Sequence, residues 1–146
     1  MSRSDARLSA GEATRSGPGR LLIAVYALFA VAATSRSAVQ IASRFNEAPL
    51  AYLLSAFAAV VYVVATVGLA RGSSASRLVA TVSCVVELTG VLVVGAVSLA
   101  VPQVFPDATV WSSFGSGYLF IPLMLPVLGL LWLRHTSPQR LATRQL

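Results

Sequence analysis

Glu87 is the side chain in this sequence best placed to do chemistry, because it is a single carboxyl group inside a long apolar segment. An ionised carboxylate is costly in the hydrocarbon of a membrane, so such a group is usually neutralised or paired, and it often serves proton or ion pathways. Small or polar residues recur along the same helical face at Ala80, Ser83, Gly90 and Ser98. This stripe favours close helix packing, and it predicts that Glu87 points toward other helices.

Arg36 is the natural candidate partner of Glu87, and it shares one helical face with Ala33, Gln40 and Arg44. At 1.5 Å per residue, Arg36 lies about 24 Å from the start of its helix and Glu87 about 14 Å from the start of its own. A direct pair across this offset of about 10 Å needs helix tilt, a bridging Gln40 or water. The alternative, that Arg36 extends to the outer lipid headgroups, stays open.

Three roles for Glu87 are open on the sequence alone. In the first, its protonated carboxyl group donates a hydrogen bond to a neighbouring helix and only fixes the packing. In the second, the desolvated carboxyl group exchanges protons or binds a cation. In the third, it contacts a lipid or a partner helix. The candidate intramembrane polar site therefore consists of Glu87, Arg36 and Gln40.

The sequence offers no second set of reactive residues. The single His135 follows the last apolar segment, Cys84 has no second thiol, and Glu47 and Asp107 are isolated acids. Nucleophilic triads, thiol–imidazole pairs and metal clusters each need several such groups together. We therefore predict no catalytic, cofactor-binding or metal-binding residues, and we do not expect an enzyme.

Long apolar segments form the elements that must position these residues. Of the 146 residues, 56% are hydrophobic and 11% are charged, whereas about a quarter of an average soluble domain is charged. These values indicate a membrane protein. We predict an all-α, antiparallel bundle of four transmembrane helices within residues 20–134, with helices at 20–43, 50–70, 78–101 and 118–133. Residues 1–19 are predicted to be a disordered basic tail, and 135–146 a polar tail.

The connection at residues 102–117 carries Pro, Asp and aromatic residues. We expect Asp107 to cap a short helix lying in the membrane interface. Trp111 and Phe114 would then dip into the lipid from that helix.

Two further patterns concern helix shape and packing. Ala51, Ser55 and Ala59 recur every four residues, which favours the close approach of another helix. Pro122 and Pro126 are expected to break or bend the fourth helix.

The distribution of Arg predicts the orientation of the chain. All eleven basic residues are Arg, and nine of them lie in the two tails and the 71–77 connection, against two in the first connection. Because basic residues accumulate on the cytoplasmic side, both termini are predicted to be cytoplasmic. The same placement explains the net charge of +6 without nucleic-acid binding. An alternative is that residues 1–33 form a signal peptide, with basic, apolar and small-residue parts in that order.

Five segments carry a resemblance to a known family: RSAVQIA at 36–42, FNEAPLAY at 45–52, VELTGVLVVG at 86–95, FPDATVW at 105–111 and GYLFIP at 117–122. The segment from Ser35 to Leu133, about two thirds of the chain, thereby resembles small, uncharacterised integral membrane proteins common in actinobacteria. The resemblance implies four transmembrane helices and no established activity.

The sequence favours an accessory or structural multi-pass protein of the bacterial plasma membrane. Its expected partners are the lipid bilayer and either a membrane protein or a second copy of itself, which it contacts through its small-residue faces; nucleic acid and cofactors are not expected. The alternative is a small proton- or cation-coupled transporter that uses Glu87 with Arg36 and Gln40.

Overall fold

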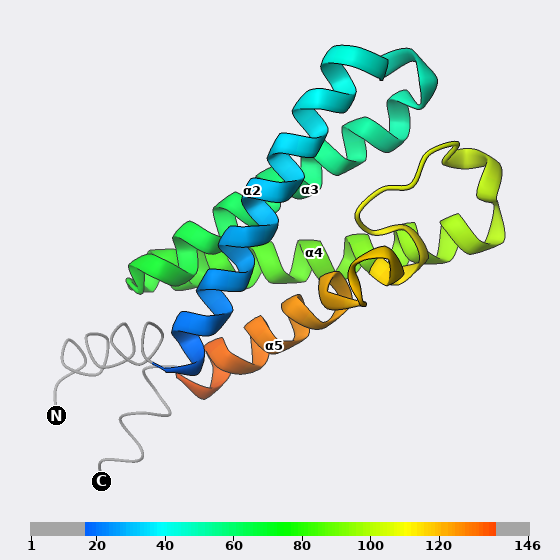
Figure 1. The fold of residues 1–146 in the computed structure, drawn as a ribbon. Helices are drawn as coiled ribbons and strands as arrows, with labels where there is room; N and C mark the ends of the chain where they lie inside the picture. Colours follow the sequence, from blue (N-terminus) through cyan, green and yellow to red (C-terminus); the bar gives the residue numbers. More distant parts are fainter. Residues whose placement is uncertain (1–16, 137–146) are drawn as a thin grey trace, which may run out of the picture.

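Four helices dominate the computed structural model, which describes residues 17–136 (Figure 1). They are α2 (Pro18–Arg44), α3 (Pro49–Arg71), α4 (Ser74–Ala100) and α5 (Ile121–His135). Within residues 17–136 there is no β-strand. The prediction of an all-α, antiparallel four-helix bundle is confirmed. The predicted tails, residues 1–19 and 135–146, lie almost wholly outside the described residues.

Short 3-10 helices form the connections. η1 (Phe45–Glu47) joins α2 to α3, whereas η2 (Pro102–Val104) and η3 (Ser112–Tyr118) lie between α4 and α5. The α3–α4 connection is shorter, because α3 ends one residue before Gly72, whose φ of 69° a residue with a side chain rarely adopts. The hydroxyl of Ser73 then caps α4 by accepting a hydrogen bond from the backbone N–H of Ser76 at 3.1 Å.

Within residues 17–136, three helices are by themselves long and apolar enough to cross a membrane. The fourth span exists only if η3 and α5 count together, and these two are bent by 97° relative to each other. α5 has 15 residues and therefore rises about 22 Å, less than the hydrocarbon thickness of about 30 Å. The predicted fourth helix at 118–133 thus begins three residues late, at Ile121.

The chain breaks just before α5, and not at the two prolines where the sequence predicted a break or bend. Leu119 and Phe120 have left-handed φ values of 59° and 60°, and the chain turns there. Pro122 follows in the first turn of α5, where a missing N–H has no cost, and the helix continues through Pro126. The prediction that these prolines break the fourth helix is therefore wrong, whereas its alternative, that they bend the helix, stays a prediction.

α4 is the central helix of the bundle. It packs against α3 on one side and against α5 and η3 on the other, while α2 packs mainly on α3. α3 and α4 cross closely at Gly68, where an added Cβ would lie 2.9 Å from the carbonyl oxygen of Ser76. The small-residue series of α3 (Ala51, Ser55 and Ala59) is buried. The series therefore packs inside this single chain.

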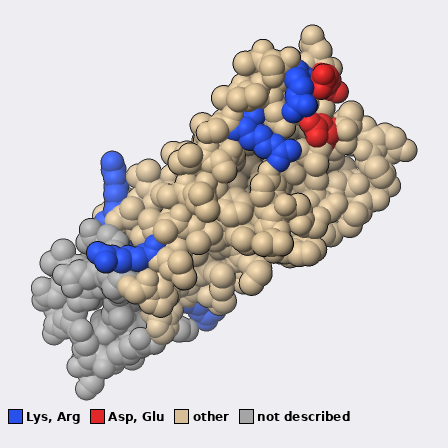
Figure 2. All heavy atoms as spheres, viewed as in Figure 1, with Lys and Arg blue, Asp and Glu red and all other residues tan. Residues whose placement is uncertain are grey.

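The outward surface of the bundle is apolar along its length. Many large hydrophobic side chains are exposed on all four helices, such as Leu21 at 68% and Leu78 at 65%. Charged side chains gather toward the two ends of the molecule, and the middle of the face in Figure 2 carries none. This distribution fits a chain whose middle is surrounded by lipid.

Candidate functional site

Glu87 is the central residue of α4 and is fully buried. The hydroxyl of Tyr26, on α2, donates a hydrogen bond to Glu87 Oε2 at 2.9 Å. The same hydroxyl lies 3.5 Å from Cys84 Sγ, one turn earlier on α4. Glu87, Tyr26 and Cys84 therefore form one buried polar cluster that joins α2 to α4 (the Glu87 cluster).

The second oxygen of the carboxyl group has no partner. Glu87 Oε1 is buried and makes no hydrogen bond to any described residue. An unpaired buried carboxylate costs several kcal/mol, and a buried polar atom left without a partner costs about 1–3 kcal/mol. Only one of the two carboxyl oxygens of Glu87 thus has a hydrogen-bond partner among the described residues.

Helical periodicity explains how α2 supplies Tyr26. Leu22, Tyr26, Phe29, Ala33 and Ser37 are all buried and recur every three or four residues, so they form one face of α2. Tyr26 was not identified from the sequence, because in an apolar segment a tyrosine can equally well face lipid or protein. The weak signal available was that Tyr26 shares a face with Ala33 and Gln40.

The structure does not bring Arg36 to Glu87. The guanidinium group of Arg36 donates a hydrogen bond to the Tyr118 hydroxyl, and its carbon lies 5.9 Å from the centre of the Tyr118 ring. Within residues 17–136, no hydrogen bond or ion pair joins Arg36 to Glu87. Gln40 is buried one turn beyond Arg36.

Aromatic rings occupy the space between Arg36 and the Glu87 cluster. Tyr26 lies 6.3 Å from Tyr62, Tyr62 lies 5.8 Å from Phe29, and Phe29 lies 5.9 Å from Tyr118. These centroid distances are typical of interacting rings. The rings pack as a continuous series that separates the charge of Arg36 from the carboxyl group.

Trp111 closes the bundle over α4 and does not lie in lipid. Its side chain is only 1% exposed, and its indole N–H donates to the Tyr62 hydroxyl at 3.0 Å. Gly90 makes room for the ring. The prediction that Trp111 dips into the membrane from an interfacial helix is wrong, because the buried hydroxyl of Tyr62 gives the indole a partner in the core.

Asp107 joins the loop to α3 and caps no helix. One of its oxygens accepts the N–H of Ala108, and the other accepts the hydroxyl of Tyr52 at 2.9 Å. The expected capping role is therefore replaced by a contact between the loop and the first turn of α3. Phe114, predicted to reach lipid, is half-buried and packs over Gly95.

Arg77 fastens α4 to the end of α5. Its side chain is buried and donates to the carbonyl oxygen of Leu133 at 2.6 Å and to the Thr136 hydroxyl at 3.1 Å. The last carbonyls of a helix lack intrahelical donors, and a cation there is favourable. The sequence treated Arg77 only as an orientation signal, because its contact with α5 is not visible in the pattern.

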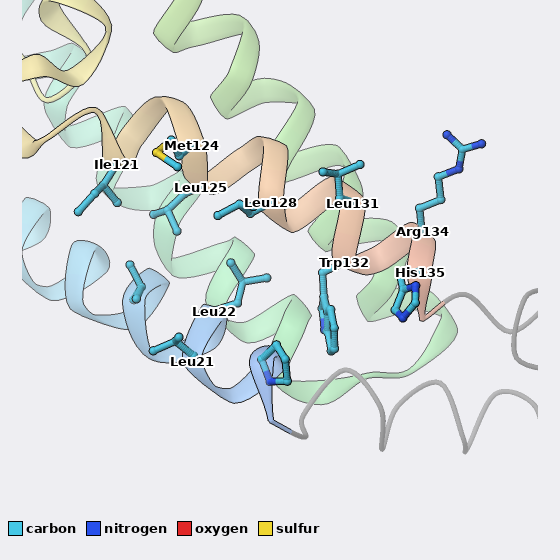
Figure 3. A pocket seen from close by; sticks show the side chains of 12 residues that line it. Leu21, Leu22, Ile121, Met124, Leu125, Leu128, Leu131, Trp132, Arg134 and His135 are labelled. Carbon is cyan, nitrogen blue, oxygen red and sulfur yellow. The ribbon is translucent and has the colours of Figure 1, made fainter.

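A second feature with binding potential is a groove of about 920 Å³ between α2 and α5. Its apolar walls are Leu21, Leu22 and Val25 of α2 and Met124, Leu128 and Leu131 of α5. Trp132, Arg134 and His135 mark one end (Figure 3). We call this feature the α2–α5 groove. It exists because these two helices contact each other only sparsely.

Neither the α2–α5 groove nor a smaller cavity of about 260 Å³ beside Arg36 is lined by Glu87. Within residues 17–136, no three His, Cys, Asp or Glu side chains gather where they could hold a metal ion.

Comparisons of the chain with protein-family models, with curated proteins and with solved structures found no match.

Proposed function

We propose that this chain is an accessory membrane protein that binds a hydrophobic molecule or segment along the α2–α5 groove. The observation that carries the proposal is the α2–α5 groove itself, a mainly apolar groove of about 920 Å³ along two helices. Large, well-formed apolar pockets with a few polar groups are the usual binding sites of proteins. The small-residue series of α3 (Ala51, Ser55 and Ala59) already packs inside the bundle, which favours the groove over that series as the binding surface.

The proposal includes a position in the cell. The chain would be a multi-pass protein of the bacterial plasma membrane with both termini in the cytoplasm, as the excess of Arg near the termini and in the 71–77 connection favours. Its resemblance to small actinobacterial membrane proteins is part of the same proposal.

A photo-crosslinking amino acid at Leu128 tests the binding role. Leu128 lines the α2–α5 groove, and Leu92 on α4 is a matched control, since both side chains are 47% exposed. We expect irradiation in the native membrane to give an adduct of defined mass at position 128, and only scattered lipid adducts at position 92. Identical adduct patterns at the two positions would contradict the proposal.

A second candidate function is proton- or cation-coupled transport through Glu87. The observation that favours it is the buried Glu87 Oε1, which has no hydrogen-bond partner among the described residues and could therefore bind a proton or an ion. Against it stands the aromatic packing around the Glu87 cluster, and the separation of Arg36 from the carboxyl group.

Glu87→Gln tests this second function. Glutamine keeps an acceptor for the Tyr26 hydroxyl but has no titratable proton. If Glu87 couples transport, the variant folds normally, and reconstituted vesicles lose ion-driven proton flux. Glu47→Gln is the control, because Glu47 is an exposed acid in η1. Equal flux in the wild type and Glu87→Gln would rule the transport function out.

A further inference from the structure

We propose that the α2–α5 groove holds one anionic phospholipid, with an acyl chain along the apolar walls and the phosphate at the end marked by Arg134 and His135. This inference rests on the proposed function and names the ligand class for the same groove.

The walls of the groove have the chemistry of an acyl-chain site. Leu21 is 68% exposed, Leu128 47% and Leu131 58%. Each buried methylene group contributes about 0.8 kcal/mol in the transfer from water, but a lipid tail already lies in hydrocarbon. The apolar walls alone therefore permit a tail without selecting a lipid, and selection must come from the polar end.

The polar end of the α2–α5 groove carries the positive charge of Arg134. Arg134 and His135 end α5, with the ring of Trp132 5.8 Å from that of His135. In Figure 3, Trp132 and His135 lie at the end of the groove beside the first turn of α2, and Arg134 extends outward beyond them. Basic side chains between transmembrane helices bind anionic headgroups, and indole rings lie at headgroup level.

The first turn of α2 adds positive potential at the same end. α2 begins at Pro18, which lines the groove. Among the described residues, no side chain caps its N-terminus and none in its first turn is acidic. The first turn carries Arg20 instead. Because a helix N-terminus already favours anions, this end of the groove suits a phosphate group.

Carboxylates lie away from this end in the described part of the chain. Glu47 belongs to η1, and Asp107 contacts the start of α3, so both lie at the opposite end of the bundle. Glu87 is buried inside α4. A partner helix or a second copy could fill the apolar walls, but an anionic lipid also supplies the counter-charge, and for this reason we favour it.

Native mass spectrometry of the full chain, released from detergent with added lipid, tests the proposal. Phosphatidylglycerol and phosphatidylcholine with the same acyl chains serve as probes. We expect one phosphatidylglycerol per chain and much weaker retention of phosphatidylcholine. Arg134→Gln should lower phosphatidylglycerol retention about fivefold, the effect typical of one basic residue at a membrane surface. Arg71→Gln, an exposed Arg at the same end of the bundle, should leave it unchanged.

A second pair of variants tests the apolar walls. Leu21→Trp fills the groove and should abolish retention of the lipid, whereas Leu78→Trp, at a position of nearly equal exposure on α4, should not. Circular dichroism checks that both variants remain folded.

Two outcomes overturn the lipid proposal alone. One is equal retention of the two lipids in the wild type. The other is a two-chain complex that Leu21→Trp dissociates while phospholipid retention stays unchanged. In that case the groove is still a docking face, but its occupant is a second copy of the chain. The proposed function is overturned as well if Leu21→Trp and Leu78→Trp show equal lipid retention and equal chain association, and if no adduct of defined mass forms at Leu128.

Discussion

Tyr26 and Glu87 form a hydrogen bond between α2 and α4 in the middle of the bundle, at 2.9 Å. The two residues depend on each other, because each is buried with few alternative partners. Polar contacts between transmembrane helices contribute modestly when both partners are present. The loss of one partner is more damaging, since the other remains buried and unsatisfied.

Tyr26→Phe should lower the unfolding free energy by about 1–3 kcal/mol, because both oxygens of Glu87 are then without a donor. Unfolding with increasing sodium dodecyl sulfate in mixed micelles measures this change. Glu87→Leu removes the carboxyl group that accepts the Tyr26 hydrogen bond. The double variant should therefore lose less unfolding free energy than the sum of the losses in the two single variants. Additive losses would show that the hydrogen bond does not couple the two residues.

Only part of this site could be predicted from the sequence. Glu87 is conspicuous as the acid in an apolar helix, and its inward orientation follows from the small residues around it. Tyr26 could not be identified, since a tyrosine suits both a buried network and a membrane interface. Arg36 shares a face with Gln40, but no pattern in the sequence indicates that Phe29 and Tyr118 pack between Arg36 and Glu87.

At the scale of elements, α4 organises the bundle because glycines let other parts approach it. Gly90 is covered by Trp111, and Gly95 by Phe114. Arg77 fixes the other end of α4 to α5. Both ends of this helix are therefore fastened to parts of the chain that come later in the sequence.

Gly90→Ala should destabilise the protein by about 1–3 kcal/mol, the usual cost of overpacking. An added Cβ would lie 2.8 Å from Trp111 Cη2, and the ring is held by its bond to Tyr62. Unfolding in mixed micelles, monitored by tryptophan fluorescence, measures the loss. Thr89→Ala is the control, since the neighbouring Thr89 is exposed. Equal stability of the two variants would mean that Trp111 does not pack on Gly90.

Arg77→Gln should also destabilise the protein, by about 1.5–3 kcal/mol, because hydrogen bonds to a charged group are lost at the end of α5. Arg71→Gln should change the stability by less than about 0.5 kcal/mol, as is usual for an exposed position. Heating in detergent while recording circular dichroism compares them. A similar small shift in both variants would contradict the fastening role of Arg77.

Helix ends with strong local signals were predictable. Pro49 begins α3 and Gly72 follows its last residue, as their backbone preferences dictate. The start of α5 was not, since Leu119 and Phe120 adopt left-handed backbone conformations that neither residue type favours. The turn at Leu119 and Phe120 depends on how the loop packs, and this packing cannot be inferred from the neighbouring residues of the sequence.

At the scale of the whole molecule, the described chain begins and ends at the same end of the bundle. Pro18 and His135, which start α2 and end α5, both line the α2–α5 groove. The antiparallel arrangement in Figure 1 therefore places the start of α2 and the end of α5 on one side of any membrane that the bundle crosses. Which side that is depends on the distribution of Arg.

Cysteine labelling can determine the side. Cys84 is the single cysteine of the chain and is buried, so the wild type should not react with a membrane-impermeant maleimide. Asn46→Cys, exposed in η1, should be labelled in intact bacterial cells. Ser74→Cys, exposed at the start of α4, should react only after the membrane is opened. The reverse pattern would contradict cytoplasmic termini.

The shortness of α5 has a consequence for the surrounding bilayer. α4, with 27 residues, and α5, with 15, rise about 40 Å and 22 Å respectively. The helical surface along α5 is therefore about 18 Å shorter than the surface along α4. A bilayer thins locally to match a short hydrophobic surface. We therefore expect the membrane to be thinner beside α5 than beside α4. Membranes of shorter acyl chains would accept such a shape with the least elastic deformation.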